Sequence, residues 1–377
     1  MRDRVPSPGK ENRVRITQDN GQIVEGVLSY ADDATQEGSA YNKANVLPDD
    51  VCSLLGIDPF TSEPKDAWFG VMQALGYAIL SIKAVEMDGT PLTDFKVAGL
   101  TGVLEDKTYT DSNGEIWLII QEGTYTLSVP DADCIDAKIP PQEVAVASGE
   151  QKQVVLQMQK TGITTKQFTS SEVVKFSGNL SGLDIFCVGG GGSGGYGGGG
   201  GGYTRTILNA AFTPYQECSV VVASGGSSTS NGIGMSGGSS SLLNCSAGGG
   251  SGGGSSSDVY IGGNGGSGGG GGENAYDAGG NGGSDGADGE RGRRDGGSGQ
   301  GTTTRAFGES GGTLYAGGGG GMGVPSGAGG AGGGGYGGRA NSQGGSGSAN
   351  TGGGGGGGTT SGNGGSGIVI VRWRYKV

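Results

Sequence analysis

The chain has 377 residues, of which 92 are glycine and only 32% are hydrophobic. Because ordinary globular chains are about 45–50% hydrophobic, a conventional core can fill only part of this protein. The formal net charge of −12 lies within residues 1–160, which leaves no basic field of the kind that nucleic acid requires. The chain contains no histidine, which excludes Ser-His-Asp and Cys-His catalysis and histidine-ligated metals.

Cysteine usage and the first residues of the chain favour assembly in a reducing cytoplasm. Five cysteines, at positions 52, 134, 187, 218 and 245, lack metal-site spacing and are odd in number, so we expect free thiols. A Cys187–Cys218 or Cys218–Cys245 bridge stays open as an alternative. The first residues contain no apolar signal region, and no run reaches about 18 apolar residues. We therefore expect no membrane insertion.

Residues 1–76 are predicted to form a small segment with short helices. NRVRIT and QIVEGVLSY alternate apolar and polar residues around DNG, which predicts a β-hairpin. Pro48 and the two acids after it favour the start of one short helix. Such short amphipathic elements need a partner chain or a trimer axis, unless they fold on themselves as a cap. A second helix is predicted after Ser62, with one apolar face made of Trp68, Phe69, Met72 and Leu75.

Residues 77–160 are predicted to form a small β-sandwich that acts as a spacer. Seven short strand-like runs are separated by DG, DSNG and EG turns, a pattern typical of sandwich folds. We expect Trp117 and Tyr125 to be core or sheet-face residues rather than a ligand platform. The runs are YAILSIKAV, FKVAGL, KTYT, GEIWLII, GTYTLSV, EVAVA and KQVVLQMQ.

Residues 161–377 hold 79 of the glycines, about one residue in three. A polyproline-II backbone has three residues per turn and no internal hydrogen bonds, so its amides must bond to neighbouring helices. Glycine lets those helices approach closely, which predicts a polyglycine-II helix bundle flanked by the strands LDIFCV and GIVIVRW. The whole chain is therefore expected to be mainly β and irregular. A disordered linker is the alternative that this composition leaves open.

Three stretches carry resemblances to known families. EGSAYNKANVL, residues 37–47, resembles the N-terminal attachment segment of tail-fibre and receptor-binding proteins of phages and prophages of Gram-positive bacteria. TDSNGEIWLIIQEGTYTLSV resembles carboxypeptidase-regulatory-like and immunoglobulin-like sandwiches. The segments Phe186–Gly192, Gly202–Val222 and Gly365–Trp373 resemble the distal adhesin domain of phage tail fibres. That resemblance implies a lattice of polyglycine helices with loops projecting from its far end, and fibres that are commonly homotrimers.

Recognition is expected from the inserts between glycine tracts, since glycine offers no side chains. Aromatic and Arg side chains on a rigid base suit binding to a glycan or a protein loop. Tyr196, Tyr203 and Tyr336 are expected only to cover the bundle. SDGADGERG lacks the spacing of a calcium loop, so we expect neither metal nor cofactor. The receptor-binding candidates are Tyr260, Tyr276, Arg293, Arg294, Arg305, Phe307, Tyr315 and Arg339.

These features predict a non-enzymatic adhesin of a virion tail, assembled in the bacterial cytoplasm. It is expected to bind a bacterial surface receptor and to contact other tail or baseplate proteins through residues 1–76. One alternative is a structural tail component that binds only virion proteins. A tail enzyme that degrades cell-wall glycans through a carboxylate pair is the weakest alternative, because the acids of the glycine-rich half have no core to tune them.

Overall fold

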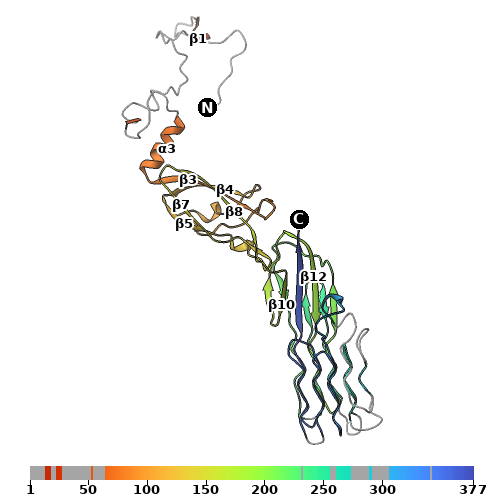
Figure 1. The fold of residues 1–377 in the computed structure, drawn as a ribbon. Coiled ribbons are helices and arrows are strands. Elements are labelled where there is room, and N and C mark those ends of the chain that lie inside the picture. The colour runs from red at the N-terminus through yellow and green to blue at the C-terminus, as the bar shows by residue number, and fades with distance from the viewer. Residues whose placement is uncertain are drawn as a thin grey trace.

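The computed structural model describes residues 13–17, 23–27, 52–53, 64–230, 232–254, 260–272, 288–290, 305–339 and 342–377. A β-sandwich, a second β region and a set of long glycine tracts follow one another along an elongated rod (Figure 1). The expectation of a mainly β and irregular fold is confirmed. Within these ranges, no helix has both the length and the apolar character that crossing a membrane needs.

The N-terminal part contains the predicted hairpin and one of the two predicted helices. Strands β1 (Arg13–Thr17) and β2 (Ile23–Val27) pair antiparallel, as the alternating segments on either side of DNG predict. Helix α3 (Pro64–Ala74) begins close to the predicted start. Met72 is buried, but Trp68 and Leu75 are largely exposed, so the predicted apolar face does not pack as one surface. The first predicted helix lies outside the described residues except at Cys52 and Ser53, and residues 37–47 lie wholly outside them.

The second part is a β-sandwich with its own core. Alternation places one face of each strand inward, and the core includes Leu80, Leu118 and Tyr125, whereas Trp117 lies on the exposed sheet face. The predicted strands FKVAGL and KTYT do not form continuous ladders. Their backbones pair only at single residues, as isolated bridges. One sheet has the order β4 (Glu115–Gln121), β3 (Tyr77–Val85) and β8 (Gln151–Gln157). The smaller pairs are β5 (Gly123–Leu127) with β7 (Gln142–Val146), and β6 (Ala137–Lys138) with β9 (Gln159–Lys160). Two 3-10 turns, η1 (Glu105–Lys107) and η2 (Pro130–Ala132), lie in the connections.

A four-stranded sheet lies at the end of the glycine-rich half that adjoins the β-sandwich (Figure 1). Its order is β10 (Thr165–Phe168), β17 (Ile368–Tyr375), β12 (Leu180–Val188) and β13 (Thr204–Ile207). The last strand of the chain thus lies between strands almost two hundred residues earlier. Both sheet faces are buried, one around Trp373 and the other around Phe186. The short pairs are β11 (Glu172–Val174) with β14 (Cys218–Val220), and β15 (Ser240–Leu242) with β16 (Cys245–Ala247).

The glycine tracts bond to one another with a period of three residues. Along the tract 198–203, successive amides donate to three different neighbouring tracts, and every third amide returns to the same neighbour. This arrangement satisfies backbone groups that no helix or sheet ladder pairs. The donor–acceptor pairs are Gly198–Gly270, Gly201–Ser267, Gly199–Gly355, Gly202–Gly352, Gly200–Ser251 and Tyr203–Gly248, at 2.7–2.9 Å.

The close approach of these tracts explains the choice of glycine. A Cβ added at Gly199 or at Gly201 would lie less than 3.0 Å from backbone atoms of a neighbouring tract. Real Cβ atoms essentially never approach other atoms so closely. The tracts in the described residues are therefore packed and hydrogen-bonded, unlike a disordered linker. Cys134, Cys187, Cys218 and Cys245 are free thiols, so neither of the bridges left open forms.

Candidate binding surface at the distal end of the glycine tracts

The glycine tracts reverse direction at turns far from the four-stranded sheet (Figure 1). One tract leaves the end of β12, turns at residues 195–197 and returns to the start of β13. Further turns occur at residues 322–325 and 358–359. We call the side chains of Tyr196, Ile233, Tyr260, Ile261, Val324 and Arg339 at this end the distal surface.

Tyr196 lies at the centre of the distal surface. Its ring meets the ring of Tyr260 edge to face, with centroids 4.7 Å apart, an arrangement that aromatic pairs favour. Its carbonyl accepts a hydrogen bond of 2.9 Å from the amide of Met322, which begins another turn. The preceding carbonyl of Gly195 accepts from Gly358, also at 2.9 Å. The turn at Tyr196 is therefore hydrogen-bonded to the turns at residues 322–325 and 358–359.

Three exposed aliphatic side chains belong to segments that lie next to the Tyr196 turn. Ile233 is 59% exposed, Ile261 is 45% exposed and Val324 is 60% exposed. The carbonyls of Gly232 and Ile261 pack against Gly195 and Gly197, which places both isoleucines next to the Tyr196 turn. Exposed apolar side chains grouped in this way are typical of a surface that contacts another molecule.

Arg339 adds a cationic side chain to the same end. Its neighbour Gly338 donates to the carbonyl of Gly357 at 2.7 Å and accepts from the amide of Gly323 at 3.0 Å. These bonds fix the backbone just before Arg339, while the side chain itself is exposed. A guanidinium can bind carboxylate, phosphate or hydroxyl groups in a fork geometry. Among the predicted site residues that the structure describes, Arg339 and Tyr260 lie at this end.

Phe307 and Tyr315 do not project from the far end as predicted. Tyr315 is only 6% exposed and its ring lies 5.3 Å from that of Phe186. Phe307, in the 3-10 turn η3 (Ala306–Gly308), is half-buried, and the guanidinium of Arg372 lies 4.2 Å from its ring centroid. Both residues cover the apolar sheet face around Phe186, because that face would otherwise be open to water. Burial removes Tyr315 from the surface that a receptor could contact.

Of the remaining predicted site residues, the structure describes Arg305 alone. Arg305 lies beside η3, where its guanidinium donates to the carbonyl of Gly312 at 2.9 Å. Tyr276, Arg293 and Arg294 lie outside the described residues.

Sequence reasoning overlooked Ile233, Ile261 and Val324. The prediction rests on the enrichment of aromatic and Arg residues at interfaces, which does not extend to aliphatic residues. The available signal was position: each is a large apolar residue in a short insert between glycine tracts. Such a residue has no local core to enter, because glycine tracts on either side bury backbone against backbone.

Asp184 is a buried carboxylate of β12 that pairs with two arginines of β17. Asp184 is buried and forms ion pairs with Arg372 at 3.1 Å and with Arg374 at 2.8 Å. Burial alone would raise the pKa of Asp184, but hydrogen bonds from Arg374, Asn209 and Arg372 outweigh it and lower the pKa to about 2. A carboxylate so strongly held in its ionised form is a poor proton donor. The described residues also contain no cluster of three or more Cys, Asp or Glu side chains that could hold a metal ion.

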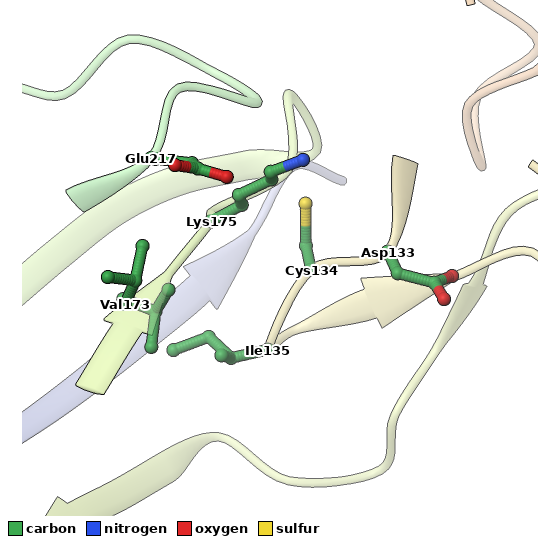
Figure 2. A pocket seen from close by; sticks show the side chains of 7 residues that line it. Asp133, Cys134, Ile135, Val173, Lys175 and Glu217 are labelled. Atoms are coloured by element: carbon green, nitrogen blue, oxygen red, sulfur yellow. The ribbon is translucent and has the colours of Figure 1, made fainter. Parts of the chain in front are cut away.

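A crevice of about 380 Å³ lies between the β-sandwich and the glycine-rich half. Figure 2 shows Asp133, Cys134 and Ile135 on one wall and Val173 and Lys175 on the other. Burial, reinforced by the nearby charge of Asp136, raises the pKa of the Cys134 thiol far above its ordinary value. Since the thiolate is the nucleophile, we expect this cysteine to react slowly at neutral pH.

Among the comparisons with known proteins, one family model bears on the glycine-rich half. No curated protein matches the chain. One similar solved structure is described as that of the Streptococcal ancillary pilin, with a TM-score of 0.19 and 14% sequence identity. The match covers 30% of this chain and 41% of that chain, so it spans less than half of the pilin. A family model described as a glycine-rich domain matches residues 165–374, more than half of the sequence, and this chain belongs to that family.

Proposed function

We propose that this protein is a receptor-binding adhesin of a phage or prophage tail fibre. The distal surface is the observation that carries the proposal, because it presents aromatic, aliphatic and cationic side chains on a backbone that is otherwise nearly free of side chains. Residues 1–76 would attach the fibre to other tail or baseplate proteins, and the fibre would be a homotrimer. The protein would belong to the virion tail and be assembled in the bacterial cytoplasm.

The glycine tracts would be polyglycine-II helices that form a rigid base for this surface. The three-residue period of their hydrogen bonds supports this assignment, since a polyproline-II backbone also has three residues per turn. A rigid base lowers the entropy that the recognition loops lose on binding. The lattice would therefore contribute to affinity without touching the receptor.

The receptor would be a glycan or a protein exposed on the bacterial surface. Tyr196 and Tyr260 present ring edges and faces on which a sugar or an aromatic side chain can pack. Ile233, Ile261 and Val324 add apolar contact area, and Arg339 adds directed hydrogen bonds. Binding without turnover fits the site better than catalysis, because its described side chains include no acid–base pair.

The test measures binding of the purified full-length chain and its variants to cells of candidate hosts. Val324→Ser and Ile261→Ser should each weaken binding by roughly ten- to a hundredfold, since burying such a side chain contributes about 1.5–3 kcal/mol. The controls are Val173→Ser and Ile163→Ser, which replace residues of nearly equal exposure, 58% and 44%, away from the distal end. The controls should leave binding unchanged.

The outcome also separates the adhesin from a structural tail component. Phage particles that carry Val324→Ser should assemble normally and adsorb poorly. If instead the distal variants adsorb like the parent, or if they fail to assemble, the adhesin assignment is wrong. Sugar release from purified cell walls would revive the enzyme alternative.

A further inference from the structure

A buried polar cluster joins the β-sandwich to the glycine-rich half. Glu86, which follows β3, accepts a short hydrogen bond from the hydroxyl of Tyr215. The amide of Met87 donates to Oδ1 of Asn179 at 3.1 Å. Asp136 accepts from the amide of Ser177 at 2.9 Å and, in a short bond, from its hydroxyl. Each bond pairs a sandwich residue with a residue of the glycine-rich half, so the cluster holds the two parts in one orientation.

Glu86 is the incompletely satisfied member of this junction. The residue is only 7% exposed, and its Oε2 has no hydrogen-bond partner. Gly178 packs against the carboxyl group so closely that a Cβ there would lie 3.2 Å from its Cδ. An ionised carboxylate in this setting lacks both water and a donor for one oxygen, which is far more costly than the neutral acid.

The charged neighbours of Glu86 do not offset this cost. Burial raises the pKa of Glu86, and the negative charges of Asp88 and Asp136 raise it further, against lowering effects of the Tyr215 hydroxyl and Lys376. Burial also raises the pKa of Asp136, although its two bonds from Ser177 act in the opposite direction.

We propose that Glu86 and Asp136 make this junction a proton-controlled lock between the β-sandwich and the glycine-rich half. In the protonated state both carboxyls lie buried without charge, and the two parts are held rigidly. As the pH rises, ionisation of Glu86 places an unpaired charge in the junction, which opens to let water reach it.

The direction follows from proton linkage. A carboxyl whose pKa is raised by folding contributes its full stability below the ordinary pKa, 4.5 for Glu86 and 3.8 for Asp136. That contribution is lost as the pH rises through the raised value. The junction is thus tightest in acid and weakens towards neutral pH.

The experiment follows hydrogen exchange of the Met87 amide in the full-length protein from pH 4 to pH 8, corrected for the intrinsic exchange rate. Protection should fall above pH 4.5 by up to about tenfold per pH unit for each carboxyl that ionises, and Glu86 and Asp136 each contribute one proton. Glu86→Gln, which cannot ionise, should flatten much of this dependence. The control Glu143→Gln changes an exposed carboxyl in β7 and should behave like the parent.

Tyr215→Phe provides an independent readout if Glu86→Gln folds poorly. The Tyr215 hydroxyl lowers the pKa of Glu86, so its removal should move the loss of protection to higher pH. A purely structural role for Tyr215 predicts lower protection at every pH with no shift of the midpoint. Protection that does not depend on pH in the parent, or an unshifted midpoint in Tyr215→Phe, overturns the proposal.

Discussion

Replacing Gly199 by alanine tests whether backbone packing holds the glycine tracts together. The new Cβ would lie 2.6 Å from the carbonyl carbon of Gly192, and a backbone atom cannot rotate away as a side chain can. The tract must therefore shift outward by about 1 Å to restore ordinary contact distances. Such a shift breaks the bonds that Gly199 donates to Gly355 and accepts from Gly319, each 2.8 Å long.

The expected cost follows from those two bonds. Each unpaired buried group costs about 1–3 kcal/mol, so the pair costs about 2–6 kcal/mol. Alanine also restricts the unfolded chain, which returns about 0.4–1 kcal/mol of stability. Gly199→Ala should therefore lower the free energy of unfolding by about 1–6 kcal/mol.

Denaturant unfolding, followed by the fluorescence of the buried Trp373, measures this change. The matched control is Gly311→Ala, because no atom lies within 4 Å of a Cβ at that position. The control should be neutral or slightly stabilising. If Gly199→Ala is as stable as Gly311→Ala, close packing of the tracts is not what stabilises this half of the protein.

Three further predictions concern the rest of the rod. Asp184→Asn should lower the free energy of unfolding by about 2 kcal/mol at pH 7, because the lowered pKa of Asp184 stabilises the folded state above pH 3.8. That contribution is lost as the pH falls towards 2, so the thermal unfolding temperatures of parent and variant should converge near pH 2. Deleting residues 368–377 removes β17 from the centre of its sheet, and amide exchange should then become fast throughout the glycine tracts. Retained protection of the tracts would show that they do not need β17 to stay ordered. Cys134 should resist alkylation at pH 8 in the folded protein and react after unfolding, since burial raises the pKa of its thiol. Mass spectrometry measures the labelling, and rapid labelling of the native state would contradict this prediction.

Local pattern was sufficient to predict several elements. The DNG turn between alternating segments predicts the hairpin of β1 and β2, and the period-two runs predict β3, β4 and β8. FKVAGL has the same alternation, yet it pairs only at single residues, because strand formation also depends on what lies alongside. The apolar runs at either end of the glycine tracts predict the strands that become β12 and β17.

Local sequence pattern predicted the candidate site less well than it predicted the strands. Tyr315 is of a residue type that is common in recognition sites, but its ring packs beside Phe186. Tyr196 was predicted only to cover the glycine tracts, but its ring packs against Tyr260 in the distal surface. Side-chain type indicates what a residue can contact, whereas only its position in the fold decides what lies within reach.

The sequence by itself determined that the tracts pack backbone against backbone, because glycine at one position in three removes the Cβ atoms that would keep them apart. Only the tertiary structure decided which tract bonds to which, how β17 returns to β12, and which inserts meet at the distal end. The physical reason is that glycine carries no side chain by which one tract can be distinguished from another. The pairing is therefore decided by the strands and turns that anchor each tract at its ends.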